Sequence, residues 1–415
     1  MGQSTYFKKI SFHIKRKKNE TMKGGVTSLF QNIGKSVICV FLLPIVLVVR
    51  ILRPFVLIRF GQLTSDRIGH YALDTEFYLC KRDLHKHRER TVDLFFDAGI
   101  VCNYQLKKMW HRKLHVCRLN KYLYICNYLL PGSEKHTITL KSERALYALL
   151  PKTSSHLSFS KREEQIGIQA LQYLGVSHGS PFICFHVRDS AYLSRLFCKS
   201  DWSYHDYRDA NINDCLQAAE ELARRGYYLI RMGAVVKDKL EMSNPMIIDY
   251  AINGKRTDFL DIYLGAKCRF FVCSTGGIYA VPTIFRRPVA YVNFVPLEYV
   301  PRWTPLDLFI PKKFWLRAEG RLMTFREVIE SGAGSFLETQ DYKKNGIEVV
   351  NNTPEEIRSL VTEMDDRLNG KWREESCDEE LQNKFWSLFK STSLPGAIRT
   401  RIGAEFLRQN EELVR

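Results

Sequence analysis

The sequence lacks the cysteine patterns that are typical of metal-binding proteins and of small disulfide-rich proteins. Its eleven cysteines are scattered, with no C-x-x-C pair and no metal-ligand spacing. A long chain with irregularly placed cysteines does not resemble a small disulfide scaffold, so we expect reduced thiols, a cytoplasmic body and no bound metal. Several of these cysteines, such as Cys184 and Cys273, lie inside apolar runs, where a free thiol behaves as a small hydrophobic side chain.

Acidic residues are almost absent from the first 60 residues. This stretch holds eleven Lys and Arg against one acid, Glu20, so it carries +10 of the net charge of +17. The remaining residues are close to balanced. The positive charge therefore belongs to an N-terminal arm rather than to a nucleic-acid-binding body, and we expect no nucleic-acid partner.

No apolar run is long enough to cross a bilayer comfortably, which takes about 20 residues. The longest run follows the basic arm and reads VICVFLLPIVLVV over 37–49, interrupted by Pro44 and flanked by basic residues. This pattern favours an interfacial anchor on an anionic membrane surface. A true span, a buried core helix and a secretory signal remain alternatives, although no A-x-A-like cleavage site follows.

Beyond residue 54 the chain alternates apolar strand patterns with helical ones. This alternation predicts an α/β fold with mainly parallel sheets, and 415 residues suggest two or three domains. Strand patterns are clearest from FICFH at 182 to PVAYVNF at 288–294. The expected divisions are 1–54 (basic arm and membrane-associating helix), 55–175 (first α/β domain), 176–370 (second α/β domain) and 371–415 (helical extension).

Three apolar strands of the second domain each run directly into a polar turn. They read FICFHVRDSAY, YYLIRMG and RFFVCSTGG. Ligands of open parallel sheets bind outside the carboxyl ends of the strands. The three turns therefore predict one phosphate-bearing ligand laid across the sheet.

The first two turns supply cationic side chains. Arg188 can bind a phosphate with two hydrogen bonds, or it can pair with Asp189 and only support a loop. His186 lies two residues earlier and can point to the same side, as a proton-transfer group or as a hydrogen-bonded core residue. Arg231 ends the second strand beside Gly233, where glycine allows close backbone approach. A plain surface turn is the alternative there.

The third turn, Ser274-Thr275-Gly276-Gly277, combines hydroxyls and glycines and is expected to open a helix. Free N–H groups at a helix N-terminus suit a phosphate, whereas a simple helix cap is the alternative. The turn is not a Walker A motif and does not match G-x-G-x-x-G. The most common nucleotide fingerprints are therefore excluded at this position.

Other polar groups are expected near the same edge. Asp249 and Tyr250 follow one strand, and Asp261 lies in a helix capped by Thr257-Asp258, where it can contact a sugar hydroxyl. In the first domain, residues 65–70 form a Gly-containing loop before a helix. This loop can receive an acceptor or a phosphate, or it can be an ordinary capped loop.

The ordered set of motifs resembles a bacterial glycosyltransferase family encoded among genes for surface-polysaccharide and lipopolysaccharide synthesis. The resemblance covers roughly residues 55–370. Its motifs are DRIGH at 66–70, FHVRDSAY, YRDANI, RMG, IIDYA, TDFLDIYL, FFVCSTGG, RRPVAYVNFVPL, LFIPK and NNTPEEI. More distantly, H-x-R at 186–188 and the turn 274–277 are similar to the fucosyltransferase-like branch of GT-B enzymes. That branch normally has H-x-R-R-x-D, whereas this chain has HVRDS, so the resemblance does not specify GDP-fucose.

The resemblance implies a GT-B fold, in which two Rossmann-like domains face each other across a cleft. It implies a nucleotide-sugar co-substrate, no obligate metal and no further cofactor. The expected donor-binding residues are Arg188, Arg231, Gly233, Asp249, Tyr250, Asp261, Ser274, Thr275, Gly276 and Gly277. Arg67 and Gly69 are expected on the acceptor side. The candidate bases for the acceptor hydroxyl are Asp66, His70, His186 and Asp189.

We therefore expect a metal-independent glycosyltransferase that acts at the cytoplasmic face of the inner membrane on a lipid-linked or cell-surface glycan acceptor. Metal-free transfer requires cations and N–H groups to stabilise the leaving diphosphate. An oxidoreductase built on the same sheets is a further alternative, but the absence of the glycine fingerprint of dinucleotide-binding proteins counts against it. A catalytically inactive, membrane-bound sugar-nucleotide-binding or scaffolding protein remains the alternative.

Overall fold

The computed structural model describes residues 41–84, 90–140, 144–196, 201–300, 304–389 and 400–415. The chain forms two compact units. The smaller comprises the described parts of Met1–Leu63, His87–Asp97 and Leu114–Thr139, and the larger comprises those of Thr64–Lys86, Ala98–Lys113 and Leu140–Arg415. These limits differ from the divisions expected at 54, 175 and 370, which stay a prediction about functional domains.

The smaller unit is built on an all-parallel sheet of four strands in the order β3-β2-β1-β4. The central pair, β1 and β2, runs in register from Leu57 opposite Thr91 to Leu63 opposite Asp97. Its elements are β1 (Leu57–Leu63), β2 (Thr91–Asp97), β3 (His115–Val116), α5 (Asn120–Tyr128), η1 (Ser133–His136) and β4 (Thr137–Ile138).

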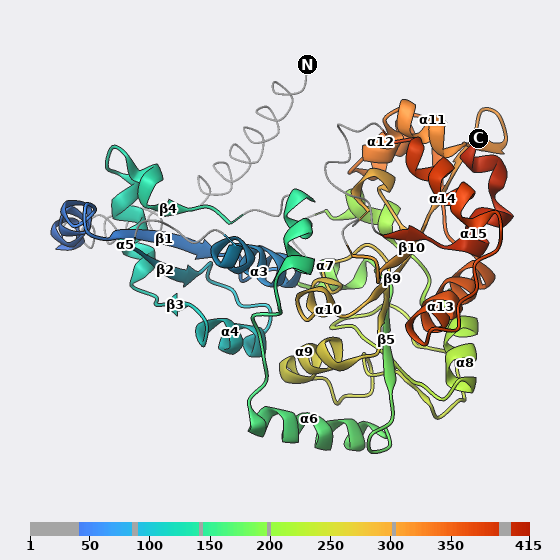
Figure 1. Ribbon diagram of the computed structural model, residues 1–415, viewed down its shortest axis with the longest axis horizontal. Helices are drawn as coiled ribbons and strands as arrows, with labels where there is room; N and C mark the ends of the chain where they lie inside the picture. The colour runs from blue at the N-terminus through green and yellow to red at the C-terminus, as the bar shows by residue number, and fades with distance from the viewer. Residues whose placement is uncertain (1–40, 85–89, 141–143, 197–200, 301–303, 390–399) are drawn as a thin grey trace. The chain divides into compact units, whose positions relative to one another are not determined.

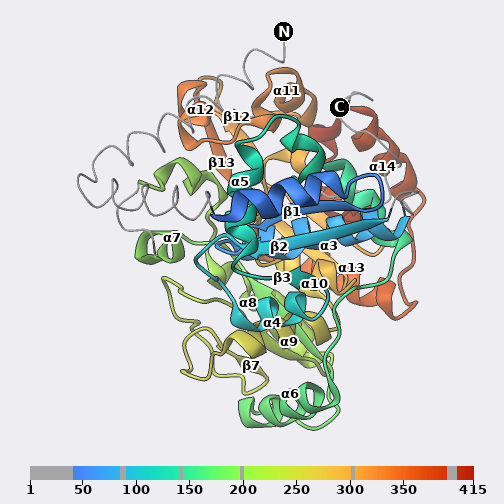
Figure 2. The same cartoon turned by 90° about the vertical axis from the view of Figure 1, so that its left-hand side faces the viewer.

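A helix over residues 41–51, here called the anchor helix, precedes β1 and belongs to the smaller unit. Its Val46 and Val49 pack against Phe60 of β1 and Leu123 of α5. Figure 2 shows this blue helix beside β1 and α5. Within the described part of the chain, no helix has both the length and the apolar character needed to span a bilayer. Residues 37–40 of the predicted apolar segment, and the basic arm before them, lie outside the described residues.

The larger unit is centred on a parallel sheet of seven strands in the order β14-β10-β9-β8-β5-β6-β7. Nearly continuous apolar sequence explains this sheet, because strands covered on both faces have no solvent side for polar residues. Its strands are β5 (Phe182–His186), β6 (Tyr228–Arg231), β7 (Ile247–Ile248), β8 (Phe271–Cys273), β9 (Val289–Phe294), β10 (Leu308–Pro311) and β14 (Arg401–Ile402).

Helices cover both faces of this sheet. Figure 1 shows α8 (Leu216–Arg224) and α13 (Pro354–Leu368) on one side, and α9 (Asp258–Lys267) and α10 (Ala280–Ile284) on the other. A capping box starts α13 at Thr353, because its hydroxyl accepts from the Glu356 N–H and the Glu356 carboxylate accepts from the Thr353 N–H.

The remaining elements of the larger unit complete the layers. A small antiparallel sheet has the order β12-β11-β13, with β11 (Lys313–Leu316), β12 (Arg321–Leu322) and β13 (Ile347–Val350). The other helices are α3 (Ile68–Leu84), α4 (Tyr104–His111), α6 (Lys161–Leu174), α7 (Ala191–Leu196), α11 (Phe325–Glu330), α12 (Thr339–Lys344), α14 (Asp378–Ser387) and α15 (Ala404–Gln409). Short 3-10 helices are η2 (Arg144–Lys152), η3 (Ser203–Arg208), η4 (Ile212–Cys215), η5 (Leu297–Tyr299), η6 (Ala333–Ser335) and η7 (Glu411–Val414).

The sequence predicted the strands from FICFH to PVAYVNF and the helix that starts at Asp258 at nearly their observed positions. The prediction that Gly276-Gly277 opens a helix was wrong. A turn continues through this segment, and α10 begins only at Ala280 and has five residues. The nine cysteines among the described residues are all free thiols.

Candidate functional site

A cavity of about 430 Å³ opens at the carboxyl edge of the seven-stranded sheet, entirely within the larger unit. Its walls come from the start of α3 and from the segments that follow β5, β6 and β8. The lining residues are 66–70, Leu73, Cys102, Tyr147, His186, Arg188, Asp189, Tyr192, Leu193, Trp202, His205, Arg208, 233–235, Arg256, Asp261 and 276–279. The structure thus brings the three predicted strand-end turns together around one space.

The ends of β5 and β8 are joined directly behind this cavity. The backbone N–H of Arg188 donates to Ser274 Oγ over 2.8 Å, and the N–H of Ser274 donates to the His186 carbonyl over 3.2 Å. Ser274 is fully buried. Thr275 Oγ1 accepts from the N–H of Val295 over 3.1 Å. The two hydroxyls therefore fix the sheet edge, and the glycines that follow them line the cavity.

The first turn of α3 lies against the same edge. A Cβ placed on Gly69 would come within 3.1 Å of the Cα of Gly277, so a larger residue would crowd the backbone at this close approach. Because α3 begins at Ile68, its first N–H groups have no partner within the helix and are suited to an anion. Arg67 precedes this turn, is exposed and lines the cavity.

The charge of Arg208 has no counter-charge among the described residues of the cavity wall. Its guanidinium Nε is buried without a hydrogen-bond partner, and burial lowers its pKa, with Arg67 among the cations that lower it further. Among the described residues, neither the Arg208 nor the Arg67 guanidinium has a hydrogen-bond or ion-pair partner. Arg208 is partly buried, and removing a cation from water without a counter-charge is costly unless a ligand supplies one.

Arg188 adds a third cation, although part of its charge is already balanced. The residue is 8% exposed, and its guanidinium donates to the His205 carbonyl over 3.1 Å and pairs with Asp209. Burial, and then repulsion from Arg208, lower the pKa of Arg188 to about 10, so it stays protonated at neutral pH. The cavity therefore has a positive potential on this side.

Two histidines of the cavity are neutral near pH 7. Burial lowers the pKa of His186 to about 4, and nearby Arg231 and Arg188 contribute. Burial and the neighbouring arginines lower the pKa of His205 to about 3. His186 Nδ1 is buried without a partner. These rings can therefore exchange neutral hydrogen bonds with a ligand without adding charge.

The candidate bases differ in their exposure and in how many of their hydrogen-bonding atoms already have a partner in the protein. Asp189 accepts from the N–H groups of Ala191 and Lys237, at 2.9 and 3.0 Å, and so uses both carboxylate oxygens. Asp66 is partly buried in the cavity wall. His70 is half-exposed, and its Nδ1 lies 3.1 Å from the buried carboxylate of Asp74 one helical turn away. This His–carboxylate pair has the geometry of an oriented base.

Arg231 and Asp249 do not line the cavity. The Arg231 guanidinium is 2% exposed, donates to the Asp238 carbonyl over 2.7 Å and pairs with Asp249 over 3.0 Å. Asp249 also accepts from the N–H of Leu240 over 3.1 Å. This pair holds the loop after β6. Gly233 in that loop does line the cavity, and a side chain there would clash with Val236.

Asp261 and Tyr250 form a second polar group at the cavity wall. The Tyr250 hydroxyl donates to Asp261 over 3.2 Å, and Arg256 pairs with the same carboxylate. Burial raises the pKa of Asp261 to about 6, against the opposing effects of Arg256 and Tyr250. Of the three, Arg256 and Asp261 line the cavity and Tyr250 is fully buried behind them.

Several cavity residues were missed at the sequence level. Arg208, His205 and Trp202 come from the loop after α7, and Arg256 precedes α9. Trp202 lies nearly parallel to His205, and Tyr279 shares a hydrogen bond of 3.0 Å with Tyr147. The YRDANI motif contains Arg208, but a strand-end rule does not reach a residue so far along a loop.

Lys312, buried at 2% exposure, supports the loop that carries Arg208. Its ammonium donates to the carbonyls of Tyr207 and Asp209 over 3.0 and 2.7 Å. Burial, with a contribution from Arg188, lowers the pKa of Lys312 to about 7. The loop is therefore held by a side chain that was not predicted to have any role.

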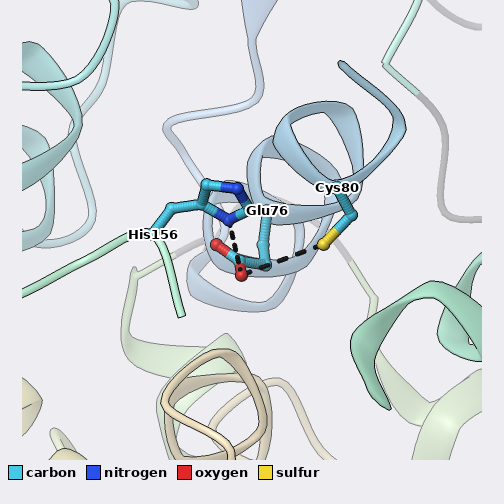
Figure 3. A group of neighbouring side chains, drawn as sticks. All are labelled: Glu76, Cys80 and His156. Atoms are coloured by element: carbon cyan, nitrogen blue, oxygen red, sulfur yellow. Dashed lines mark hydrogen bonds and ion pairs between the residues drawn. The ribbon is translucent and has the colours of Figure 1, made fainter. Parts of the chain in front are cut away.

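Outside the cavity, Glu76, Cys80 and His156 place metal-type ligand atoms within 4.8 Å of one another (Figure 3). The Arg286 guanidinium already contacts two members of this group, Glu76 and Cys80. It donates to Glu76 over 2.7 Å and lies 3.7 Å from the Cys80 sulfur, and it also donates to carbonyls of the 150–154 segment. A guanidinium in this place repels a metal cation, so we interpret the group as a structural ion-pair network.

No protein-family model matches the sequence, and a search of curated proteins finds no match. Among solved structures, a glycosyl transferase family 9 protein of Veillonella parvula DSM 2008 aligns at TM-score 0.45 and 11% identity, over 77% of this chain and 99% of that one. ADP-heptose LPS heptosyltransferase II of E. coli aligns at 0.37 and 12%, over 61% and 90%. The iron-containing dodecameric glycosyltransferase TibC of enterotoxigenic E. coli H10407 aligns at 0.32 and 11%, over 60% and 63%. TM-scores below 0.5 at these identities establish neither a shared fold nor a shared activity.

Proposed function

We propose that the protein is a glycosyltransferase that uses a nucleotide-sugar donor. The observation that supports this most strongly is the uncompensated charge of Arg208, beside Arg188 and Arg67 in one cavity. Three cations and the free N–H groups of the α3 start fit a diphosphate better than a single carboxylate. A volume of about 430 Å³ lies within the range of small-molecule sites.

The remaining walls suit the other parts of such a donor. Trp202, Tyr192 and Tyr279 offer aromatic surface for a nucleoside. Asp261 and neutral His186 are placed to accept hydrogen bonds from ribose or sugar hydroxyls. The donor-side roles expected for Gly233, Gly276 and Gly277 are kept in this proposal, as close-approach positions. Arg231, Asp249, Tyr250, Ser274 and Thr275 act as supports behind the cavity.

In the proposed reaction, the acceptor hydroxyl oxygen forms a bond to the anomeric carbon of the donor. The bond between that carbon and the phosphate oxygen breaks, and its electron pair leaves with the nucleoside diphosphate. Arg67, Arg188 and Arg208 stabilise the charge that develops on this leaving group. They supply the cationic charge that a metal ion provides in other transferases, which supports a metal-independent reaction.

The proton of the acceptor hydroxyl requires a base. We assign His70, oriented by Asp74, because a carboxylate behind an imidazole fixes its orientation and stabilises the charged ring. Asp66 is the second candidate because it lines the cavity beside Arg67. Asp189 is less suited, since backbone N–H groups already engage its oxygens. His186 is less suited because a pKa of about 4 makes it a weak base.

The acceptor and the location are further parts of the proposal. A lipid-linked or cell-surface glycan acceptor at the cytoplasmic face of the inner membrane fits the basic arm and the exposed apolar anchor helix. The GT-B arrangement is supported by two separate all-parallel sheets. The likeness to the fucosyltransferase branch stays a prediction.

The direct test screens nucleotide sugars for a rise in melting temperature and then measures transfer of radiolabelled sugar to membrane extracts. A ligand that binds only the folded state raises apparent stability by mass action. We expect stabilisation by at least one nucleotide sugar and release of its nucleoside diphosphate. Stabilisation without release or transfer would favour the alternative of an inactive sugar-nucleotide-binding or scaffolding protein. No stabilisation by any donor would contradict both.

A further inference from the structure

Most of the apolar side chains of the anchor helix are exposed at the protein surface. A surface helix normally places polar residues on its solvent face, but this helix has no charged residue before Arg50. Two of its side chains, Phe41 and Ile51, are 76% and 73% exposed, and Phe55 just beyond is 77% exposed. The exposed apolar residues of the helix, together with Leu52 and Phe55 of the turn that follows it, are here called its outward face: Phe41, Leu43, Ile45, Leu47, Val48, Ile51, Leu52 and Phe55.

Packing fixes the direction in which this outward face points. Val46 and Val49 are buried in the small core of the smaller unit, and Leu42 packs against the same core. Arg50 fastens the end of the helix to the end of α5, where its guanidinium donates to the Asn127 side chain over 2.9 Å and to the Pro131 carbonyl. The helix is therefore part of the folded unit, and its opposite face is presented as a fixed surface.

Cations gather where this surface ends. A cavity of about 760 Å³ lies between the end of the anchor helix and the start of β1. Arg53 and Arg90 line it together with Ile51 and Phe55. Both arginines are exposed, and neither has a side-chain hydrogen bond or ion pair with any other described residue. Apolar and cationic walls in one cavity match a molecule with a phosphate beside hydrocarbon.

We propose that the outward face of the anchor helix inserts into the surface of a bilayer of anionic phospholipid, and that Arg53 and Arg90 bind the lipid phosphates in this cavity. The helix then lies in the plane of the interface, with its apolar side chains among the acyl chains. The proposal rests on the membrane location proposed above and is independent of the sugar-transfer chemistry.

Charge distinguishes a lipid surface from two other occupants. A second copy of the chain packed on this face would bring the same arginines together across a two-fold axis. Residues 1–36 carry eight Lys and Arg and one acid, so they repel Arg53 and Arg90 rather than neutralise them. An anionic bilayer satisfies the apolar face, these arginines and the basic arm together.

The apolar part of the proposal is tested by cosedimentation of the full chain with vesicles of phosphatidylcholine, with and without phosphatidylglycerol. The variant carries Ile45→Glu and Val48→Glu, two exposed positions that the core does not use. The matched control carries Ile166→Glu and Ile168→Glu on α6, both 42% exposed. We expect wild type and control to bind the anionic vesicles, and the anchor variant to bind at least ten-fold more weakly.

The headgroup site is tested by Arg53→Glu with Arg90→Glu, against Lys161→Glu with Arg162→Glu on α6, which changes the net charge equally. We expect the first pair to remove most of the preference for phosphatidylglycerol and the second to preserve it. Equal binding by both pairs would contradict the headgroup site.

Two results would overturn the whole proposal. One is undiminished vesicle binding by the Ile45→Glu and Val48→Glu variant, which would show that the basic arm alone binds. The other is a wild-type protein that stays with the supernatant and dimerises through this face in light scattering. Transfer to a detergent-solubilised acceptor is measured in parallel, because failure of catalysis there would leave the membrane result unaffected.

Discussion

The backbone N–H of Arg188 and the hydroxyl of Ser274 are 2.8 Å apart and join the ends of β5 and β8 where the cavity begins. Ser274 Oγ is the acceptor for an N–H group that is itself buried. The position of Arg188, one of four arginines that line the cavity, therefore depends on this bond. The Ser274 hydroxyl, which was predicted to contact the donor, thus also positions Arg188 in the cavity wall.

Ser274→Ala should destabilise the fold by about 1–3 kcal/mol, because it leaves a buried donor without a partner. The loss should appear in urea unfolding without any ligand. Ser387→Ala removes an exposed hydroxyl at the end of α14 and should change stability by less than about 0.5 kcal/mol. Equal effects of the two substitutions would contradict the role of the Arg188–Ser274 bond.

Gly69→Ala should also destabilise the larger unit, by about 1–3 kcal/mol. The new methyl group would lie 3.1 Å from the Gly277 backbone, which has no flexible side chain to move aside. Gly276→Ala is the control, since its methyl group would meet only ordinary contacts of 3.8 Å and more. A melting temperature of Gly69→Ala equal to that of Gly276→Ala would show that α3 does not pack as described.

The sequence predicted the secondary structure correctly where the pattern of apolar residues matches the burial of the element that they form. The short apolar runs at 182–186 and 289–294 favour strands of a sheet covered on both faces, and they are β5 and β9. It failed at α10, where glycines that permit a turn look like glycines that open a helix. The two-residue β14 contains too few positions to show any period.

The cavity residues also divide into those that the local sequence identifies and those that depend on contacts with distant parts of the chain. Residues adjacent to strand ends, such as Arg188 and Gly277, were identified because topology alone places them there. The role of Arg231 depends on Asp249, which lies 18 residues later and neutralises it. Arg208 was missed because its position depends on a loop held by Lys312 from another part of the sheet.

His70→Gln should lower the rate of sugar transfer by about 10²–10⁴-fold if His70 is the base. Donor affinity should change little, because the ring is half-exposed and is not one of the arginines proposed to bind the diphosphate. Asp74→Asn should give a smaller loss, since it disturbs the orientation of the ring and retains the ring itself. Single-turnover rates and donor titration separate these effects. A full rate in His70→Gln would transfer the role to Asp66.

The pairing of His156 with two carboxylates should make stability depend on pH. Burial opposes the charged ring, but its contacts with Glu76 and Asp83, both at 2.9 Å, outweigh burial and raise the pKa of His156. Because the folded-state pKa lies above the unfolded value, the stabilisation is complete below about pH 6.5 and is lost as pH rises through the folded-state pKa. The stability difference between wild type and His156→Gln should therefore shrink with rising pH. The same substitution at exposed His178 should give a small difference at every pH, and a wild-type advantage that grows above neutrality would contradict the assignment.

Donor titration of two arginine variants tests the central claim most directly. Arg208→Met removes a partly buried cation without a counter-charge, whereas Arg225→Met removes a partly buried cation that pairs with Asp365 and Asp366 at 2.8 and 2.7 Å. We predict that Arg208→Met weakens binding of the stabilising nucleotide sugar at least ten-fold while the ligand-free protein is as stable as wild type or more so. Arg225→Met should lose stability and keep donor affinity. Unchanged donor affinity in Arg208→Met would show that this cavity does not bind the diphosphate.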